Sequence, residues 1–438
     1  MTKPLLLLKT LLILLLINTA QAAEQLYSWQ PSVTPELAKK GTYAVGVQTE
    51  EIVNKNAFNH HNFNGTYERK LTVEVWYPTN AKTDAETNTN TKNKATYEAV
   101  TRTHIPFVVA GQAYRDAEPL VLKNDETKFP FVVLSHGYTG HRTLMFYLAE
   151  HLASHGYVVA SIDHTDSTTA EIDVEKAPMA GFISTLIHRS RDQQFTLDYF
   201  RSSASPISKI TDFDHASVIG YSMGGFGAIN TVGGCYDIAA ANLIAIGMPK
   251  EYAEKLAPVF QFCNAGKEST DPSWKALVAL APWGQEYNLH QADSLAKLTV
   301  PSLYISGDQD DISGYEHGVK KLFEQTSKED NYLLVYKNAR HNVAPHPAPQ
   351  AAYSNDVDLG HYFEPNWNMQ QLNRFNQHFV LAFINCHIKK TSCEYLPTTS
   401  DGTQVKKADG SYTKAWPGMP ERWATGLEFH RASSAKKN

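Results

Sequence analysis

The sequence contains little cysteine, glycine or proline. Its 438 residues include only 4 cysteines, 25 glycines and 21 prolines, which excludes a disulfide-dense or collagen-like protein. It also lacks a large excess of charge of either sign, because the formal net charge is −5, and such mild acidity disfavours nucleic acid as a partner. Since 42% of the residues are hydrophobic, the chain is not disordered and can bury a sizeable core.

The N-terminus has the pattern of a secretory signal peptide. Lys3 and Lys9 provide positive charge, residues 11–17 form an apolar run, and Ala20-Gln21-Ala22 matches a cleavage site. The run is too short to span a bilayer as a helix, although an uncleaved anchor is the alternative. We expect residues 1–22 to be removed, which takes away two lysines and changes the net charge from −5 to −7. The mature protein is then periplasmic or extracellular, without stable membrane insertion.

The four cysteines are even in number, and export would permit disulfides. Three pairings are possible. We favour the local one, because Cys386 and Cys393 would close a short loop, and Cys235 and Cys263 would join the ends of an insertion. Free buried thiols are the alternative. The spacings resemble no zinc site, so we expect no metal.

Strand and helix patterns alternate along most of the chain. Residues 43–47 and 71–77 have the pattern of opening antiparallel strands, and the polar tract 80–94 is expected to be an exposed loop or a disordered insertion. Further strands are expected at residues 131–134, 158–162, 216–219, 276–280, 303–306 and 332–336, and helices at 143–154, 184–201, from 223 onward and at 369–384. Repeated βα units with hydrophobic strands predict a mostly parallel sheet with helices on both faces.

These patterns indicate a single α/β catalytic domain over residues 23–438, and we find no internal repeat. The core covers about 40–390, an insertion covers about 234–274, and a C-terminal extension covers about 394–438. The insertion contains an apolar, helix-like run at 238–246. We expect it to form either a cap over a pocket or an outer packing element.

The segment Gly220-Tyr221-Ser222-Met223-Gly224 lies between an expected strand and an expected helix. This is the context of the G-x-S-x-G nucleophile elbow, in which glycines allow a tight, strained turn that exposes a serine hydroxyl above the sheet edge. A serine hydroxyl becomes a good nucleophile when an imidazole accepts its proton and a carboxylate orients that imidazole. We therefore predict Ser222 as the nucleophile, followed along the chain by an acid and then a histidine.

Three carboxylates after the strand at 303–306 compete for the role of the acid: Asp308, Asp310 and Asp311. We choose Asp310, because Asp-x-Ile after a strand-end Gly-x-x is the spacing common at this position in α/β hydrolases. The loop follows the carboxyl end of a predicted parallel strand, where open α/β sheets place their ligands.

His341 is our choice for the base, because it is the first histidine after the strand at 332–336. His346 and His361 are its competitors. The pair His60-His61 lies in a polar loop without either partner, so we expect it at the surface.

The tetrahedral intermediate of acyl transfer needs two backbone N–H groups directed at its oxyanion. The amide of Met223, directly after the nucleophile, is expected to supply one. The loop at 135–140 is expected to supply the other, which we assign to Tyr138. His136 in the same loop is then a structural residue rather than a second base.

Several motifs together resemble one branch of the α/β hydrolases. Ser135-His136-Gly137-Tyr138, residues 152–159 and Ile162-Asp163-His164 are similar to the branch that contains platelet-activating-factor acetylhydrolases, dienelactone-hydrolase-like esterases and cutinase-like polyester hydrolases. Ala281-Pro282-Trp283 resembles the polyester hydrolases in particular. The similarity covers about residues 40–390.

This resemblance implies the same roles for the five site residues already chosen and adds two substrate contacts. Trp283 would be a pocket wall beside the acyl group, and Tyr138 would also contact the substrate. The chain departs from the family in two ways: typical dienelactone hydrolases have cysteine where this chain has Ser222, and cutinase-like enzymes lack an insertion like 234–274.

We predict an exported serine hydrolase of carboxylic esters that forms an acyl-enzyme and needs no metal or organic cofactor. Its substrate would be a small-molecule, lipid or polymeric ester. A phospholipid hydrolase of short acyl chains, a polyester hydrolase and an amidase or peptidase are the enzymatic alternatives. A catalytically silent binding protein with a hydrolase fold is the non-enzymatic one.

Overall fold

The computed structural model describes residues 22–27, 33–80, 94–123, 126–260, 270–326 and 328–432. An eleven-stranded sheet runs through this part of the chain in the order β11-β10-β9-β8-β7-β5-β6-β2-β1-β4-β3. The strands are β1 (Ala44–Phe58), β2 (Thr66–Thr79), β3 (Lys94–Val100), β4 (Pro106–Arg115), β5 (Phe129–Ser135), β6 (Val158–Asp163), β7 (Thr211–Tyr221), β8 (Trp274–Leu280), β9 (Ser302–Gly307), β10 (Asn331–Tyr336) and β11 (Leu427–Arg431).

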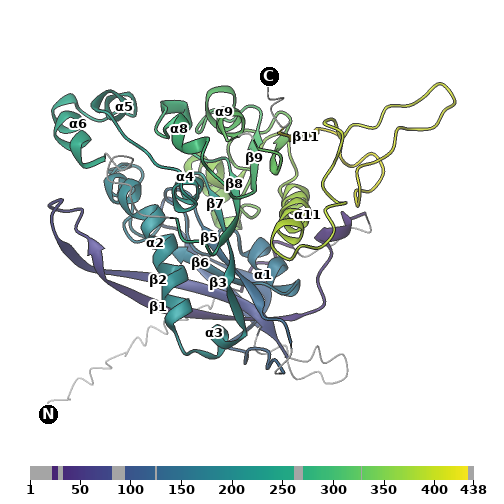
Figure 1. Cartoon of the computed structure of the whole chain (residues 1–438), viewed down its shortest axis with the longest axis horizontal. Helices are drawn as coiled ribbons and strands as arrows, with labels where there is room; N and C mark the ends of the chain where they lie inside the picture. Colours follow the sequence, from purple (N-terminus) through teal and green to yellow (C-terminus); the bar gives the residue numbers. More distant parts are fainter. Residues whose placement is uncertain are drawn as a thin grey trace, which may run out of the picture.

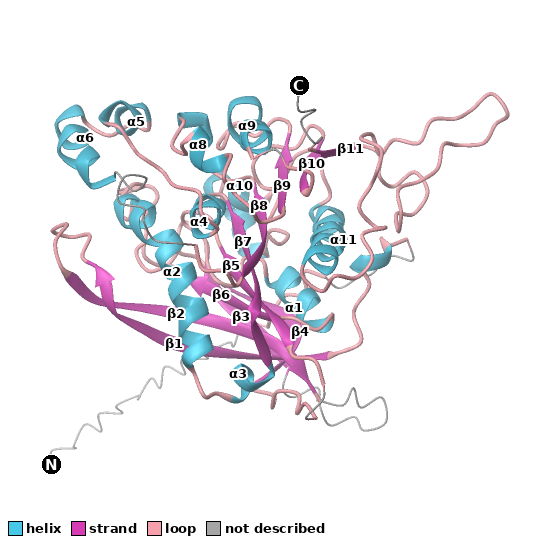
Figure 2. Ribbon diagram, in the orientation of Figure 1, coloured by secondary structure: helices cyan, strands magenta, loops and turns pink. Residues whose placement is uncertain are grey.

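Helices cover both faces of this sheet (Figures 1 and 2). The α-helices are α1 (Phe146–Ser154), α2 (Phe182–Ser202), α3 (Pro206–Ile210), α4 (Met223–Thr231), α5 (Ala240–Ala245), α6 (Lys250–Leu256), α8 (Ala292–Leu295), α9 (Lys320–Gln325), α10 (Asp356–Tyr362) and α11 (Met369–His387). Shorter turns are η1 (Glu36–Ala38), η3 (Ala257–Phe260), η4 (Gln285–Tyr287), η5 (Tyr315–Val319) and η6 (Gln350–Ser354).

The middle of the sheet is parallel, as the sequence predicted. Strands β6, β5, β7, β8, β9 and β10 pair in parallel, and every residue of β5 is buried. Strands with helices on both sides cannot alternate polar and apolar residues, which is why these segments are continuously hydrophobic. The expected opening strands are also present, since β1 pairs antiparallel with β2, and β2 with β6.

Alternate residues of β5 belong to two separate cores. Val132 and Leu134 pack in one cluster with α1 and α11, whereas Phe131 and Val133 pack in another with α2 and α4. Successive strand side chains point to opposite faces, so one strand ties both helical layers together. Figure 1 shows α2 and α11 on opposite sides of the sheet.

The sheet is wider than the sequence patterns indicated. Strands β3 and β4 pair at one edge, and β11 from the C-terminal extension pairs antiparallel with β10 at the other. The extension also packs back on the domain through Trp416, whose ring centroid lies 5.9 Å from that of Phe379 in α11. A disulfide joins Cys386 to Cys393, as expected. Cys263, the signal segment 1–21 and most of the polar tract, 81–93, lie outside the described residues.

Within its described part, the insertion packs beside the domain. Leu243 of α5 and Leu256 of α6 join a third buried cluster with α2 and with Phe226 of α4. The Tyr236 hydroxyl donates to the Leu186 carbonyl at 2.7 Å. These contacts hold α5 and α6 against α2 and α4, and the two arrangements that the sequence left open, a cap or an outer packing element, stay predictions.

Candidate active site

Ser222 occupies the sharp turn between β7 and α4. Its backbone has φ 53° and ψ −116°, a conformation that is strained for a residue with a side chain. The flanking glycines make the turn possible: a Cβ atom on Gly220 would lie 2.2 Å from the Gly224 carbonyl oxygen, and one on Gly224 would lie 2.2 Å from that of Ser135. The G-x-S-x-G pattern is therefore a steric requirement of this turn.

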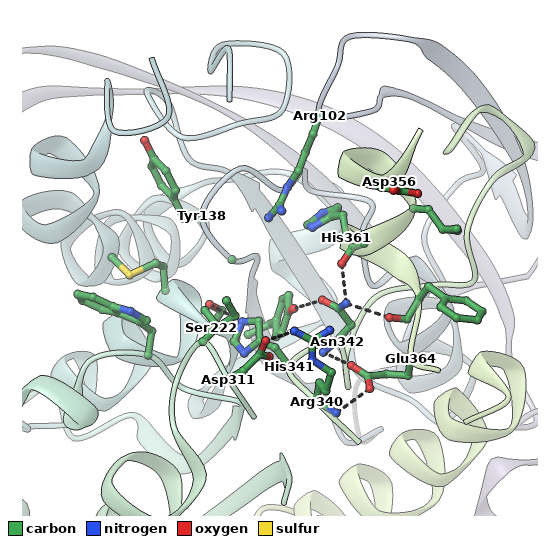
Figure 3. Close-up of a pocket in the computed structure, with 18 of the residues that line it drawn as sticks. Arg102, Tyr138, Ser222, Asp311, Arg340, His341, Asn342, Asp356, His361 and Glu364 are labelled. Carbon is green, nitrogen blue, oxygen red and sulfur yellow. Dashed lines mark hydrogen bonds and ion pairs between the residues drawn. The ribbon is translucent and has the colours of Figure 1, made fainter. Parts of the chain in front are cut away.

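Three of the predicted site residues meet at this turn. His341 Nε2 lies 3.0 Å from Ser222 Oγ, and His341 Nδ1 lies 3.0 and 3.1 Å from the two carboxylate oxygens of Asp310. Figure 3 shows the Ser222 and His341 side chains facing each other. Their loops follow β7, β9 and β10, whose carboxyl ends share one edge of the sheet.

The carboxylate of Asp310 is buried, and its neighbours favour its ionised form. Its Oδ1 accepts hydrogen bonds from the amides of Ile312 at 3.0 Å and Ser313 at 2.8 Å. Burial raises its pKa, but His341 and these two amides outweigh burial and hold the pKa of Asp310 below its usual value. The carboxyl group is thus charged at neutral pH and can orient an imidazole.

The two competing carboxylates have other partners. Asp311 is exposed and pairs with Arg340, and Asp308 pairs with Lys337 at 3.1 Å. Neither is the acid that contacts His341.

The amides of Tyr138 and Met223 are the expected oxyanion donors, and both residues line the pocket above Ser222. Gly137 comes so close that a Cβ there would lie 3.1 Å from the Ser222 Cβ. The loop that carries Tyr138 is held by Thr139, whose amide donates to the Ser167 carbonyl at 3.0 Å. This brings the loop after β5 next to the first turn of α4, as an oxyanion hole requires.

His136 is fully buried and has a role in loop shape. Its Nδ1 lies 2.6 Å from the Gly137 carbonyl oxygen, and its Nε2 accepts a hydrogen bond from the amide of His164 at 3.2 Å. Both ring nitrogens are therefore occupied by the backbone around the elbow. Burial, with the charge of Arg189 next, lowers the pKa of His136 well below its usual value, so the ring is neutral.

The prediction that His60 and His61 both lie at the surface is wrong for His60. His61 is exposed, but the His60 ring packs on His188 and Tyr67 and its side chain is only 10% exposed. The long hairpin of β1 and β2 carries this loop back against α2, which a reading of the local sequence cannot show.

The other two candidate bases are buried elsewhere around the pocket. His346 stacks on Tyr362 with a centroid separation of 5.0 Å. His361 lies in the last turn of α10 and lines the pocket. Neither has a hydrogen bond to Ser222.

The pocket around Ser222 has a volume of about 480 Å³ and two unlike halves. One half is apolar and includes Trp283, whose ring meets that of Phe182 edge-on at 5.4 Å, and Tyr138, 5.6 Å from Phe182. The other half is polar and charged. It includes Arg102, Asn342, His361 and Glu364 (Figure 3).

The sequence did not predict this polar half; of its residues only His361 was named, as an alternative base. Arg102 comes from the turn between β3 and β4, and His361 and Glu364 come from α10 and the loop after it. None of them belongs to a motif, so the sequence carries no local signal for them. Among the described residues, the insertion 234–274 contributes no side chain to the pocket lining.

Two kinds of structure are absent among the described residues. No helix among them is long and apolar enough to cross a membrane. No group of three or more His, Cys, Asp or Glu side chains among them is arranged to hold a metal ion.

Comparison with solved structures identifies the fold. A ferulic acid esterase from Streptomyces cinnamoneus superimposes with a TM-score of 0.53 over 90% of this chain and 100% of that one, at 16% sequence identity. The chain has the α/β-hydrolase fold. Within these hydrolases, a family model described as "Platelet-activating factor acetylhydrolase, isoform II" matches residues 32–185.

Curated relatives of this α/β hydrolase include cutinases. Cutinase est1 of Thermobifida alba is 27% identical over 212 residues, which are 48% of this chain and 52% of that protein. Cutinase est2 of the same organism is 24% identical over 255 residues, or 58% of this chain and 59% of its own length. The chain thus spans between half and three fifths of the length of these relatives. The predicted resemblance to the acetylhydrolase and cutinase-like branch is confirmed.

Proposed function

We propose that this protein is a serine hydrolase of carboxylic esters. The observation that carries the proposal is the chain of contacts from Asp310 through His341 to Ser222, at 3.0 Å on each side of the imidazole, at the edge of a pocket of about 480 Å³. The likeness to cutinases and to the acetylhydrolase family supports the same reaction class.

In the proposed mechanism, His341 removes the proton of Ser222 and the serine oxygen attacks the ester carbonyl carbon. The carbonyl oxygen becomes an oxyanion, which the amides of Tyr138 and Met223 stabilise. Asp310, ionised because of its neighbours, fixes the imidazole tautomer and stabilises its cation. His341 then protonates the leaving alcohol, so that an acyl-enzyme remains.

The second half of the reaction uses the same groups. A water molecule loses its proton to His341 and attacks the acyl carbon, and the proton returns to Ser222 when the acid leaves. No step needs a metal or an organic cofactor. The apolar half of the pocket, with Trp283 and Phe182, suits the acyl group.

We further propose that the protein is exported and that residues 1–22 are its signal peptide. The positive, apolar and small-residue segments in that order support this. Mass spectrometry of protein recovered from the periplasm or medium should find Ala23 as the first residue, and recovery of the uncleaved chain would contradict the proposal.

The decisive test replaces the nucleophile. Ser222→Ala should reduce kcat on a series of 4-nitrophenyl esters from C2 to C12 by a factor on the order of 10³ or more. Ser202→Ala, which removes an exposed hydroxyl at the end of α2, is the matched control and should retain activity. A fluorophosphonate should label the parent protein but not Ser222→Ala.

Equal activity of Ser222→Ala and the parent would show that the nucleophile is wrong. Absence of both activity and labelling in the folded parent would favour the silent binding protein. Short-acyl phospholipid vesicles and polyester films, compared with soluble esters, distinguish the two alternatives that the related families suggest.

A further inference from the structure

Arg102 is a half-buried cation in the pocket without a partner among the described residues. Within the described residues its side chain makes no hydrogen bond or ion pair, and its Nε atom is shielded from solvent. The guanidinium lines the same pocket as Ser222, and Figure 3 shows it extending toward the pocket between Tyr138 and His361. Burial lowers its pKa, but an arginine stays protonated at neutral pH.

The acidic groups nearby are already used by other partners. Asp358 accepts hydrogen bonds from the Thr103 amide at 2.8 Å and from Asn355 at 2.9 Å. Glu364 accepts those of the Arg340 and Asn342 amides, each at 2.6 Å.

Two further acids line the pocket without contacting Arg102. Asp311 is paired with Arg340, and Asp356 is exposed at the start of α10. Asp358 acts on Arg102 only through space and anchors the turn that carries it.

The neighbouring His361 does not neutralise the charge of Arg102. Burial, and next the charge of Arg102, lower the pKa of His361 well below its usual value, so its ring is neutral. Its Nε2 is buried and has no hydrogen-bond partner among the described residues. Two shielded nitrogens without hydrogen-bond partners, Arg102 Nε and His361 Nε2, are costly unless a ligand supplies acceptors or donors for them.

The position of His341 indicates which part of the ester lies here. His341 protonates the leaving oxygen, so the alcohol part of the substrate lies on its side of the scissile bond. Arg102, His341 and His361 line the same pocket, and Figure 3 shows Arg102 and His361 on the same side of it. The apolar wall around Trp283 belongs to the other half of the pocket.

We propose that Arg102 binds an anionic group, a carboxylate or a phosphate, on the alcohol part of the substrate ester. The inference rests on the proposed ester hydrolysis and deepens it. A guanidinium forms paired, charge-assisted hydrogen bonds with the oxygens of either anion. The enzyme would therefore prefer esters whose alcohol carries a negative charge.

The test compares acetyl esters whose phenol differs only in its para substituent, which is anionic in two of them and neutral in the third. The probes are 4-acetoxybenzoate, (4-acetoxyphenyl)phosphonate and the neutral 4-acetoxybenzamide, and the readout is the ratio of kcat/KM between a charged ester and the neutral one. In the parent protein we expect a ratio of at least about tenfold for one of the two anions. The anion that gives this ratio, carboxylate or phosphonate, shows which of the two groups Arg102 binds.

Arg102→Gln should reduce this ratio to near one. Arg340→Gln is the matched control, because it removes a pocket arginine that already has an acidic partner, and it should keep the ratio within about twofold. A ratio that Arg102→Gln leaves unchanged, or that Arg340→Gln lowers equally, overturns the proposal. A ratio near one for both anions in the parent does so as well.

Two further measurements locate the anion and separate the two proposals. If Arg102→Gln lowers the ratio for mono(4-nitrophenyl) glutarate over 4-nitrophenyl butyrate instead, the charge lies on the acyl part and our placement is wrong. If the parent hydrolyses none of these esters, the proposed function fails. Calorimetric binding of 4-hydroxybenzoate to the parent but not to Arg102→Gln would then still support the anion site, and equal binding to both would overturn it.

Discussion

Asp310 and Asp311 are neighbours in the sequence with opposite surroundings. Asp310 is 6% exposed and its carboxylate faces His341 and two amides, whereas Asp311 is exposed and pairs with Arg340. The same chemical group therefore has two different environments, because the backbone directs one carboxylate inward.

We predict that Asp310→Asn lowers kcat by a factor on the order of 10³–10⁴, because an amide can hold the imidazole in the wrong tautomer and cannot stabilise its cation. Asp311→Asn, the adjacent control, should change kcat by less than about threefold. Steady-state kinetics on a 4-nitrophenyl ester measures both. Comparable losses in the two variants would contradict the assignment of Asp310.

At the scale of elements, a buried polar network joins β2, β6 and α2 behind the elbow. Arg69 donates from Nε and Nη2 to the Asp192 carboxylate, each at 2.9 Å. His164 Nδ1 lies 3.0 Å from Asp192, and its Nε2 lies 2.8 Å from the Ser135 hydroxyl. The network thus connects β2 to Ser135, where the loop that carries Tyr138 begins.

We predict that Asp192→Asn lowers the free energy of unfolding by about 3–5 kcal/mol, because it removes the buried carboxylate that neutralises the buried guanidinium of Arg69. Asp166, another acid that contacts Arg69, is 34% exposed, so Asp166→Asn should cost no more than about 1 kcal/mol. Urea unfolding at neutral pH measures both values. Similar losses in the two variants would show that the network is not the cause.

At the scale of the whole molecule, buried neutral histidines are numerous. Burial lowers the pKa of His164 to about 3 and of His290, His346 and His378 to about 4. Unfolding exposes these rings, and they then titrate near 6.5. Between these two pKa values the unfolded chain binds more protons than the folded one, so stability is complete above about pH 6.5 and falls as the pH decreases.

His290 isolates this effect for one group. With a folded pKa of about 4 and an unfolded value of 6.5, it should account for about 2 kcal/mol of the stability lost between pH 8 and pH 5. His290→Leu should reduce the loss by that amount, and His317→Leu, an exposed control, should not. Urea unfolding at both pH values tests this, and an unchanged loss in His290→Leu would contradict it.

Much of the fold and part of the site were predictable from the sequence. The strands β5 to β10 can be recognised in the sequence as hydrophobic runs, because both of their faces are buried. The turn at Ser222 needs glycine on both sides, so its motif is visible locally. The strand β11 was not predictable, because its pairing partner β10 lies about 90 residues earlier and edge strands have weak patterns.

The sequence by itself determined the order of the βα units, the elbow and the identity of His341 as the next histidine after its strand. Only the tertiary structure decided which carboxylate faces that histidine, where His60 packs, and that Arg102 reaches the pocket from the turn between β3 and β4. The physical reason is the distance along the chain over which each interaction acts. Hydrophobic periodicity and glycine sterics act within one element, whereas the surroundings of a charge depend on segments that meet only when the chain folds.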